Sequence, residues 1–398
     1  MKKQAFLLLT IVACIAQVSA QTINTKKIFR ALEKQTAVQL DSVAAVRKDH
    51  PELVAPRSIV DGKLSVVRSG DWTSGFFPGI LWYYYEFTGD TKWKELAQTY
   101  TSFIEKEKSN ANSHDVGFKV YCSFGNALRL SPDPHYKEVI IQGAKTLVSR
   151  FNPKIGLTRS WDLNKDKWQY PVIIDNMMNL ELLFAATKLS GDSTYYKVAV
   201  THANTTLKNH FRPDNSSYHV VDYDTITGQA IKKITAQGYA DGSAWARGQA
   251  WGLYGYTMCY RFTKDPHYLQ QAEKIAAFIF SNPNLPADMV PYWDYNAPNI
   301  PNEERDASAA AIMASALYEL SSYSSNKKDY IKKADFIVRS LTDHYRSPLG
   351  ENKGFILLHA VGHKPAKSEI DVPIIYADYY YIEALLRQKN LKKKGSAF

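Results

Sequence analysis

The chain has 398 residues, of which 45% are hydrophobic and 22% are charged, the composition of an ordinary globular protein with material for a large core. Its formal net charge of +10 suits an anionic partner, although charge of this size also serves solubility alone. Nucleic acid is not expected as the ligand, because the lysines are dispersed along the chain and the one dense run of lysines lies in the tail, at 392–394. An acidic polysaccharide fragment fits the charge of a secreted chain better.

Residues 1–20 have the pattern of a signal peptide. Lys2 and Lys3 form a basic start, 5–16 is almost continuously apolar, and 18–20 supplies small residues for cleavage. We therefore predict a protein secreted to the periplasm, with a lipoprotein attached through Cys14 as the less favoured alternative. No later stretch is apolar for the length of a membrane span, so the mature chain is expected to have none.

A turn followed by the start of an aromatic-rich helix recurs along the chain. In each copy an Asp stands three positions before a Trp or Tyr, at the end of a turn sequence such as Thr-Gly-Asp or Ser-Pro-Asp. Asp at that position can cap the helix that follows, and Gly or Pro can end the helix before it. The clear copies place Asp90 before Trp93, Asp133 before Tyr136, Asp192 before Tyr195 and Asp265 before Tyr268, with a weaker copy at 326–330.

The segments before these turns are apolar nearly all round with helical spacing, which predicts buried helices. They are 117–130, 177–189, 249–262, 307–320 and 376–386. The segments after the turns, such as 92–104 and 268–280, carry charges on one side and are predicted to be outer, half-exposed helices. The chain therefore alternates inner and outer helices, about six pairs in all.

Helix pairs joined by short turns either stack as an open array or close into a ring. Closure is favoured here, because the inner helices are too apolar to line an open groove. We predict an all-α fold, an (α/α)6 barrel of inner and outer helices, and no Pro/Ser-rich linker divides it, so 21–398 is predicted as a single domain. The strand-like segments 218–223 and 229–235, around Thr227 and Gly228, are expected to form a hairpin inserted at one end.

Unusual polar and aromatic residues stand where the inner helices begin. If these helices run parallel, their starts share one rim, and a rim with convergent polar groups is the default place for a ligand. Taken singly, each Asp there is also explained as a helix cap. The starts are Asp71-Trp72, His114-Asp115, Asp175-Asn176, 245–249, Arg305-Asp306 and 376–378.

Asp175 is the strongest candidate for chemistry. The apolar runs 172–174 and 177–178 surround it in sequence, and burial among apolar groups raises the pKa of a carboxyl group. A second carboxylate, Asp115, would raise it further, and a carboxyl protonated near neutral pH can serve as a general acid. The alternative is a structural Asp bonded to backbone N–H groups, whose pKa would be lowered.

Tryptophans fall at or near the same loop-to-helix junctions. Their flat faces can stack on sugar rings, although some are expected to belong to the barrel core instead. They are Trp72, Trp161, Trp168, Trp245, Trp251 and Trp293. Once the signal peptide is removed, the remaining cysteines, Cys122 and Cys259, indicate neither a disulfide framework nor a metal site, and both are expected to be buried.

Several motifs, in order along nearly the whole mature chain, resemble glycoside hydrolase family 88, the unsaturated glucuronyl hydrolases. The most specific is Trp-Ala-Arg-Gly-Gln-Ala-Trp at 245–251, and the related rhamnogalacturonyl hydrolases usually carry a Gly-Asn-Gly variant there, which this chain lacks. The others are Asp-Trp-Thr-Ser-Gly-Phe-Phe-Pro-Gly at 71–79, Ser-His-Asp-Val-Gly-Phe at 113–118, Ile-Ile-Asp-Asn-Met-Met-Asn at 173–179, Gln-Gly at 237–238 and Asp-Tyr-Tyr-Tyr-Ile-Glu-Ala-Leu at 378–385.

This resemblance implies an (α/α)6 barrel that hydrates the C4=C5 double bond of the unsaturated uronic acid left on oligosaccharides by polysaccharide lyases. It implies Asp175 as general acid and base and Asp115 as its essential partner, with no metal and no cofactor. The substrate is then an unsaturated uronic-acid oligosaccharide, with glycosaminoglycan fragments favoured, and a monomer is expected. The residues expected to bind the sugar are His114, Trp161, His219, Gln237, Trp245, Arg247 and Trp251, of which Trp161 and His219 are placed by spacing alone.

The segment 363–368 precedes the last inner helix and should lie on the active rim, where Lys367 and Ser368 could meet a sulfate or the leaving sugar; a solvated loop is the alternative. Three other functions remain open from the sequence. One is an unsaturated rhamnogalacturonyl-type hydrolase, and another is a sugar epimerase, for which His114 and His219 are the candidate histidines. The third is a secreted glycan-binding protein without catalysis, which would keep the tryptophans but has no need of Asp115 and Asp175 in these settings.

Overall fold

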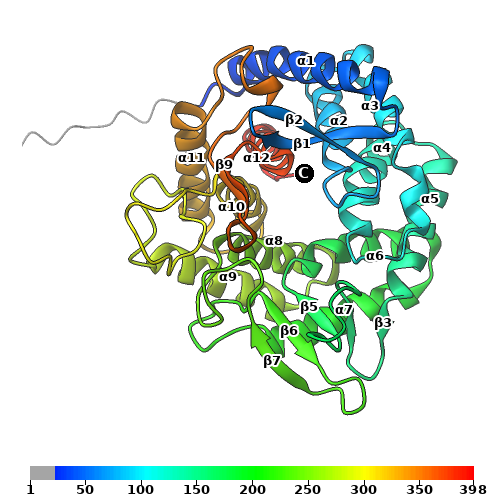
Figure 1. Cartoon of the computed structure of the whole chain (residues 1–398), viewed down its shortest axis with the longest axis vertical. Coiled ribbons are helices and arrows are strands. Elements are labelled where there is room, and N and C mark those ends of the chain that lie inside the picture. Colours follow the sequence, from blue (N-terminus) through cyan, green and yellow to red (C-terminus); the bar gives the residue numbers. More distant parts are fainter. Residues whose placement is uncertain (1–22) are drawn as a thin grey trace, which may run out of the picture.

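A computed structural model describes residues 23–398 of the chain as a ring of helices (Figure 1). The ring alternates inner and outer helices along the sequence, as the repeat of turns and aromatic helix starts predicts. The inner helices are α2 (Phe76–Thr88), the π-helix η2 (Gly117–Gly125) continued by α4 (Asn126–Leu130), α6 (Asn176–Ser190), α8 (Ala246–Thr263), α10 (Ala307–Leu320) and α12 (Ile375–Lys394). The outer helices are α1 (Thr25–Asp49), α3 (Thr91–Ser102), α5 (Pro134–Val148), α7 (Ser193–Asn209), α9 (Pro266–Ser281) and α11 (Lys327–His344).

The ring is closed, because each inner helix packs on the next and α12 packs on α2. Most residues of the inner helices are buried, and in α10 each residue from Ala307 to Leu320 is buried. Small residues let neighbours approach closely: a β-carbon at Gly255 of α8 would lie 2.5 Å from the β-carbon of Met177 on α6. The predicted (α/α)6 barrel is therefore confirmed, and the open array is wrong.

The turn aspartates cap the outer helices as the sequence predicts. Asp90, Asp133, Asp192 and Asp265 each accept a hydrogen bond from the backbone N–H two residues later, at 2.8–2.9 Å. Each bond satisfies one of the N–H groups that a helix start leaves without a partner. These four turns lie at the end of the barrel where the inner helices finish. The polar and aromatic candidates of the sequence analysis lie at the opposite end, where the inner helices begin.

Short strands cover the end where the inner helices begin. The predicted hairpin is confirmed as β6 (Val220–Tyr223) and β7 (Ala230–Ile234), and β5 (Pro171–Ile173) joins it as an antiparallel neighbour of β6. Two ribbons that the sequence does not predict, β1 (Leu53–Val60) with β2 (Lys63–Arg68) and β8 (Ala360–His363) with β9 (Ser368–Val372), complete this cover. The remaining elements are β3 (Phe151–Asn152), β4 (Leu157–Thr158) and the short helices η1 (Glu105–Ser109), η3 (Asn352–Gly354) and η4 (Lys364–Ala366).

Over residues 23–398, no helix is both long and apolar enough to cross a bilayer. The predicted signal peptide at 1–20, and Cys14 within it, lie outside the described residues and stay predictions. Cys259 is buried as expected, whereas Cys122 is only partly buried; both are free thiols.

Candidate active site

The starts of the inner helices meet at one rim, as the sequence predicts. Arg247 at the start of α8 bonds to Asp306 at the start of α10, with 3.0 Å between Nη1 and Oδ2. The Trp72 ring lies 5.0 Å from the ring of Tyr376, which brings the region before α2 against α12. The predicted candidates from helices far apart in sequence therefore face one region of the molecule.

Most of the acidic residues on this rim have structural partners. Asp306 caps α10 by accepting from the backbone N–H of Ser308, and Asp378 accepts from two backbone N–H groups of the preceding loop. Asp71 accepts from the N–H and the hydroxyl of Thr73. The capping or structural interpretation holds for these three residues.

Asp175 is different, because it stands directly before α6 without capping it. Its Oδ2 is buried and has no hydrogen-bond partner within 23–398. The same is true of Nε2 of His219, which lies 3.7 Å from that oxygen, and of the indole Nε1 of Trp251. Buried polar atoms normally have partners, so three unpartnered atoms around one carboxyl group indicate a place for a ligand.

Burial raises the pKa of Asp175 to about 7, and the nearby charge of Asp115 acts in the same direction. The charge of Arg247, a backbone hydrogen bond and the nearby N–H of the Trp251 indole, which lies close without forming a hydrogen bond of normal geometry, oppose this rise but do not cancel it. A group with this pKa is about half protonated near neutral pH, so it can give a proton and take one back. The lowered pKa expected for a purely structural Asp is not found.

Strand pairing places His219 beside Asp175. The antiparallel pairing of β5 and β6 is extended by a bond from the Ile174 N–H to the carbonyl of His219, at 3.0 Å. The Nδ1 of His219 accepts from the backbone N–H groups of Ala236 and Gln237, so its proton is on Nε2, the atom that faces Asp175. Burial holds the pKa of His219 well below its ordinary value, with the Arg247 charge adding to the effect, so the ring is a neutral donor.

Asp115 is oriented by its sequence neighbours. Oδ2 accepts from the Ser113 hydroxyl at 2.9 Å, and Oδ1 lies 3.3 Å from Nε2 of His114. His114 is buried, and burial lowers the pKa of its ring. Ser113 also forms a β-bridge with Trp161, which brings this predicted aromatic residue to the same region.

Arg247 is held by several acceptors at once. Nη2 donates to Oε1 of Gln237 at 2.9 Å and to the carbonyl of Gly362 at 2.7 Å, and Nη1 donates to the carbonyl of Val361. The guanidinium lies 4.6 Å from the Trp245 ring, and that ring lies 4.4 Å from the ring of His219. Gln237, Trp245, Arg247 and His219 therefore form one cluster.

Lys367 and Ser368 lie further out. Both side chains are exposed, and they stand where η4 leads into β9. The strand paired with β9 is β8, whose backbone carbonyls accept hydrogen bonds from Arg247. The structure therefore places this segment on the rim but brings neither side chain into contact with Asp175 or Arg247. Sequence reasoning missed Arg57 on β1 and Glu369 on β9, which bond to each other, since nothing in either segment marks them.

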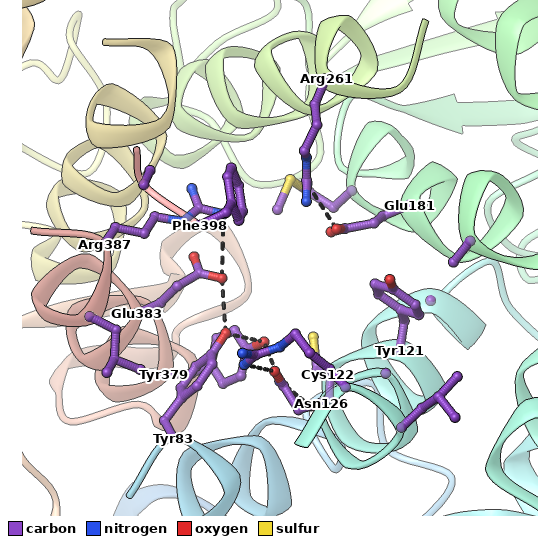
Figure 2. A pocket seen from close by; sticks show the side chains of 18 of the residues that line it. Tyr83, Tyr121, Cys122, Asn126, Glu181, Arg261, Tyr379, Glu383, Arg387 and Phe398 are labelled. Atoms are coloured by element: carbon purple, nitrogen blue, oxygen red, sulfur yellow. Dashed lines mark hydrogen bonds and ion pairs between the residues drawn. The ribbon is translucent and has the colours of Figure 1, made fainter. Parts of the chain in front are cut away.

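A separate cavity of about 440 Å³ opens at the other end of the barrel, where the inner helices finish (Figure 2). Its acidic side chains are already engaged. Glu181 pairs with Arg261 at 2.8 Å, and Glu383 accepts from the hydroxyls of Tyr83 and Tyr254 at 2.9 and 3.1 Å. Because these carboxylates have fixed partners, none of residues 23–398 gives this cavity the free carboxyl group that Asp175 supplies at the opposite end.

Glu383→Ala is expected to destabilise the protein by about 3–5 kcal/mol, because it leaves the buried hydroxyls of Tyr254 and Ser315 without their acceptor and removes one of the two carboxylates beside Arg387. Urea denaturation measures the change. Glu86→Ala at the same cavity is the control: it breaks a more exposed pair with Arg129 and should cost less than about 1 kcal/mol. Equal losses for the two variants would show that the Glu383 network is not structural.

The barrel is closed, and its rim combines a half-protonated carboxyl group, a second carboxylate and aromatic side chains. This arrangement is suited to cleaving a carbohydrate. The protein is a glycoside hydrolase. Residues 58–380 match the pattern of Glycosyl Hydrolase Family 88, and the chain belongs to that family.

Characterised relatives agree with this assignment. The chain is 55% identical to an unsaturated glucuronyl hydrolase of Formosa agariphila, over 82% of each chain. It is 34% identical to an unsaturated chondroitin disaccharide hydrolase of Streptococcus pyogenes, over 82% of this chain and 83% of that one. The solved structure of an unsaturated glucuronyl hydrolase specific for heparin superposes with a TM-score of 0.86 at 46% identity, covering 92% of this chain and 98% of that one.

Proposed function

We propose that this enzyme is an unsaturated glucuronyl hydrolase that releases the 4,5-unsaturated uronic acid from glycosaminoglycan oligosaccharides produced by polysaccharide lyases. The observation that carries the proposal is Asp175, a buried carboxyl group with a pKa of about 7 and an oxygen without a partner. Relatives with 34–55% identity bear the names of this activity. A glycan-binding protein without catalysis would have no use for such a group.

In the first step, protonated Asp175 donates its proton to C4 of the vinyl ether. The electron pair of the C4=C5 bond forms the new C–H bond, and positive charge develops at C5 and the ring oxygen. Asp115 helps to keep the proton on Asp175 beforehand, because its negative charge disfavours ionisation of its neighbour.

In the second step, the carboxylate of Asp175 takes a proton from water while the water oxygen bonds to C5. The sum is addition of one water across the double bond, and Asp175 ends in its starting state. The hemiketal formed at C5 opens, and the hemiacetal left at C1 breaks down to release the remaining sugar. His219, neutral with its proton on Nε2, donates a hydrogen bond to the reacting carboxylate or to the substrate, and Arg247 supplies positive charge beside an anionic sugar.

The loss of the vinyl-carboxylate absorbance on mixing enzyme with unsaturated disaccharides tests the activity. We expect the band to disappear as the disaccharide is consumed. An enzyme that cleaved the glycosidic bond directly would release the second sugar before the band decays, because the freed unsaturated sugar loses its double bond only afterwards, by ring opening. A binding protein would change nothing. Including unsaturated rhamnogalacturonyl disaccharides separates the pectin-type alternative, for which we expect little turnover.

The leaving sugar is proposed to reach the exposed hairpin with Lys367 and Ser368. The names of the relatives include both heparin-specific and chondroitin activities, which differ in sulfation and linkage. We expect Lys367→Ala to raise KM for a sulfated disaccharide by up to about fivefold, with little change for its unsulfated counterpart, since an exposed charge contact contributes about 1 kcal/mol or less. Lys392→Ala, at the far end of α12, is the matched control. Equal effects on both substrates would remove the sulfate assignment.

We propose further that the enzyme acts as a secreted monomer. Secretion rests on the signal-peptide pattern of residues 1–20, with lipid attachment at Cys14 less favoured. A monomer suffices for the site, because Asp115, Asp175, His219 and Arg247 come from one chain. Cell fractionation and light scattering test the two points, and a cytoplasmic or oligomeric protein would contradict them.

A further inference from the structure

Arg57 lies on β1, outside the cluster around Asp175, yet it makes three charged hydrogen bonds. Nε and Nη2 donate to the two oxygens of Glu369 on β9 at 2.7 and 2.9 Å, and Nη1 donates to Oδ2 of Asp71 at 2.7 Å. A bidentate guanidinium–carboxylate pair fixes both position and orientation, which a lysine cannot reproduce. The Glu369 side chain is only 7% exposed, so its carboxylate is shielded from water, whereas Arg57 is 27% exposed.

Glu369 is held in an unfavourable backbone conformation. Its φ is +54°, and Lys367 and Asp371 on either side have φ values of +54° and +56°. This left-handed region is costly for residues other than Gly, so such a strand persists only where side-chain contacts impose it. The bidentate bond with Arg57 supplies that contact.

The Glu369 side chain lies directly against the strand that holds Arg247. A β-carbon at Gly362 of β8 would lie 2.5 Å from Oε2 of Glu369, so the carboxylate rests on the bare backbone of that residue. The carbonyls of Val361 and Gly362 are two of the acceptors of the Arg247 guanidinium. A continuous set of contacts therefore runs from Arg57 through Glu369 and β8 to Arg247.

We propose that Arg57 is a positioning residue for this reaction: with Glu369 it clamps β9 onto β8 and thereby fixes the Arg247 guanidinium beside Asp175 and the substrate. The inference rests on the proposed function, because Arg247 is taken to act at the sugar. It predicts that loosening the Arg57–Glu369 pair, which does not touch Asp175, changes both the binding of the anionic substrate and the proton affinity of Asp175.

The direction of the second effect follows from the charges around Asp175. Asp115 faces it from the segment before η2, His219 from the residue before β6, and Arg247 and Trp251 from α8. Of these, Arg247 lowers the pKa of Asp175 by its charge. If the guanidinium moves away, this pKa rises, Asp175 stays protonated to higher pH, and the alkaline limb of the pH–rate profile moves upward.

Arg57→Lys and the nearly isosteric Glu369→Gln test the clamp in the intact enzyme with an unsaturated disaccharide. We expect each to lower kcat/KM by about tenfold to a hundredfold, chiefly through KM, and to move the alkaline limb to higher pH. The double variant should lose little more than either single variant, because both remove one unit. Arg68→Lys is the control, since Arg68 is on the same hairpin, 72% exposed, and pairs with an exposed glutamate.

The outcomes separate the two proposals. An inactive wild-type enzyme on all unsaturated uronic substrates would overturn the proposed function. An active wild type whose Arg57→Lys and Glu369→Gln variants match Arg68→Lys in kcat/KM and pH profile would overturn the clamp alone. If the Arg57→Lys and Glu369→Gln variants had a lower melting temperature but an unchanged pH profile and KM, the pair would have a purely structural role. That result would also overturn the proposed clamp.

Discussion

Asp175→Asn should lower kcat by about a thousandfold or more while leaving disaccharide affinity within a few-fold of wild type, as expected for loss of a general acid. The amide has nearly the shape of the carboxyl group but cannot give a proton to carbon or take one from water. The turnover is measured by loss of the vinyl absorbance, and affinity by calorimetry with the same disaccharide. Retention of more than about a tenth of the wild-type kcat would contradict the role of Asp175.

Asp378→Asn is the matched control for this experiment. Asp378 is also a buried Asp near an inner-helix start, and burial raises its pKa to about 8. Its oxygens, however, accept from the backbone N–H groups of Ile356 and Leu357 at 2.9 and 2.8 Å. The variant is therefore expected to lose stability and to keep its kcat per folded molecule, so a raised pKa by itself does not identify the catalytic acid.

Asp115→Asn should reduce kcat at neutral pH by more than about tenfold and move the alkaline limb of the pH–rate profile to lower pH. The negative charge of Asp115 contributes to raising the pKa of Asp175 to about 7. Without this charge the pKa falls, while Arg247 and the Trp251 indole still favour the ionised form. A larger share of Asp175 is then ionised at neutral pH, so fewer enzyme molecules hold the proton that the first step requires.

The pH dependence of kcat between pH 5 and pH 9 measures this change. Ser113→Ala is the companion variant, because it removes the hydroxyl that orients Asp115 at 2.9 Å but keeps the charge. It should lower kcat with a smaller movement of the limb. An alkaline limb that stays in place or moves upward in Asp115→Asn would contradict the proposed electrostatic role.

The inner helices were predictable because their physics is local. A helix that is apolar nearly all round, such as Ala307–Leu320, must be buried whatever surrounds it, and its neighbours in the chain repeat the pattern. The capping aspartates, such as Asp90 and Asp265, were predictable for the same reason, since their bonds reach only two residues along the chain. The closed ring followed from these two observations.

The ribbons over the rim were not predictable from local pattern. Arg57 and Glu369 are 312 positions apart in sequence, and their pairing depends on closure of the ring. The left-handed residues Lys367, Glu369 and Asp371 also give β9 no sequence signature of a strand. The positioning role of Arg57 therefore became visible only with the structure.

The sequence could mark candidate residues near the inner-helix starts, and the apolar neighbours of Asp175 distinguished it from Asp306 and Asp378. It could not exclude a capping role for any of the three. Hydrogen-bond partners separate them: Asp306 and Asp378 bond to backbone N–H groups, whereas Asp175 caps nothing. The tautomer of His219 likewise depends on backbone donors at 236 and 237 that fold back onto its ring.

Proton NMR of the reaction in D2O tests most directly whether Asp175 protonates C4 of the unsaturated sugar. The mechanism predicts that the vinyl C4–H signal disappears at the rate at which the second sugar is released, with one deuterium entering C4. Release of the second sugar ahead of the loss of the vinyl signal would contradict the mechanism.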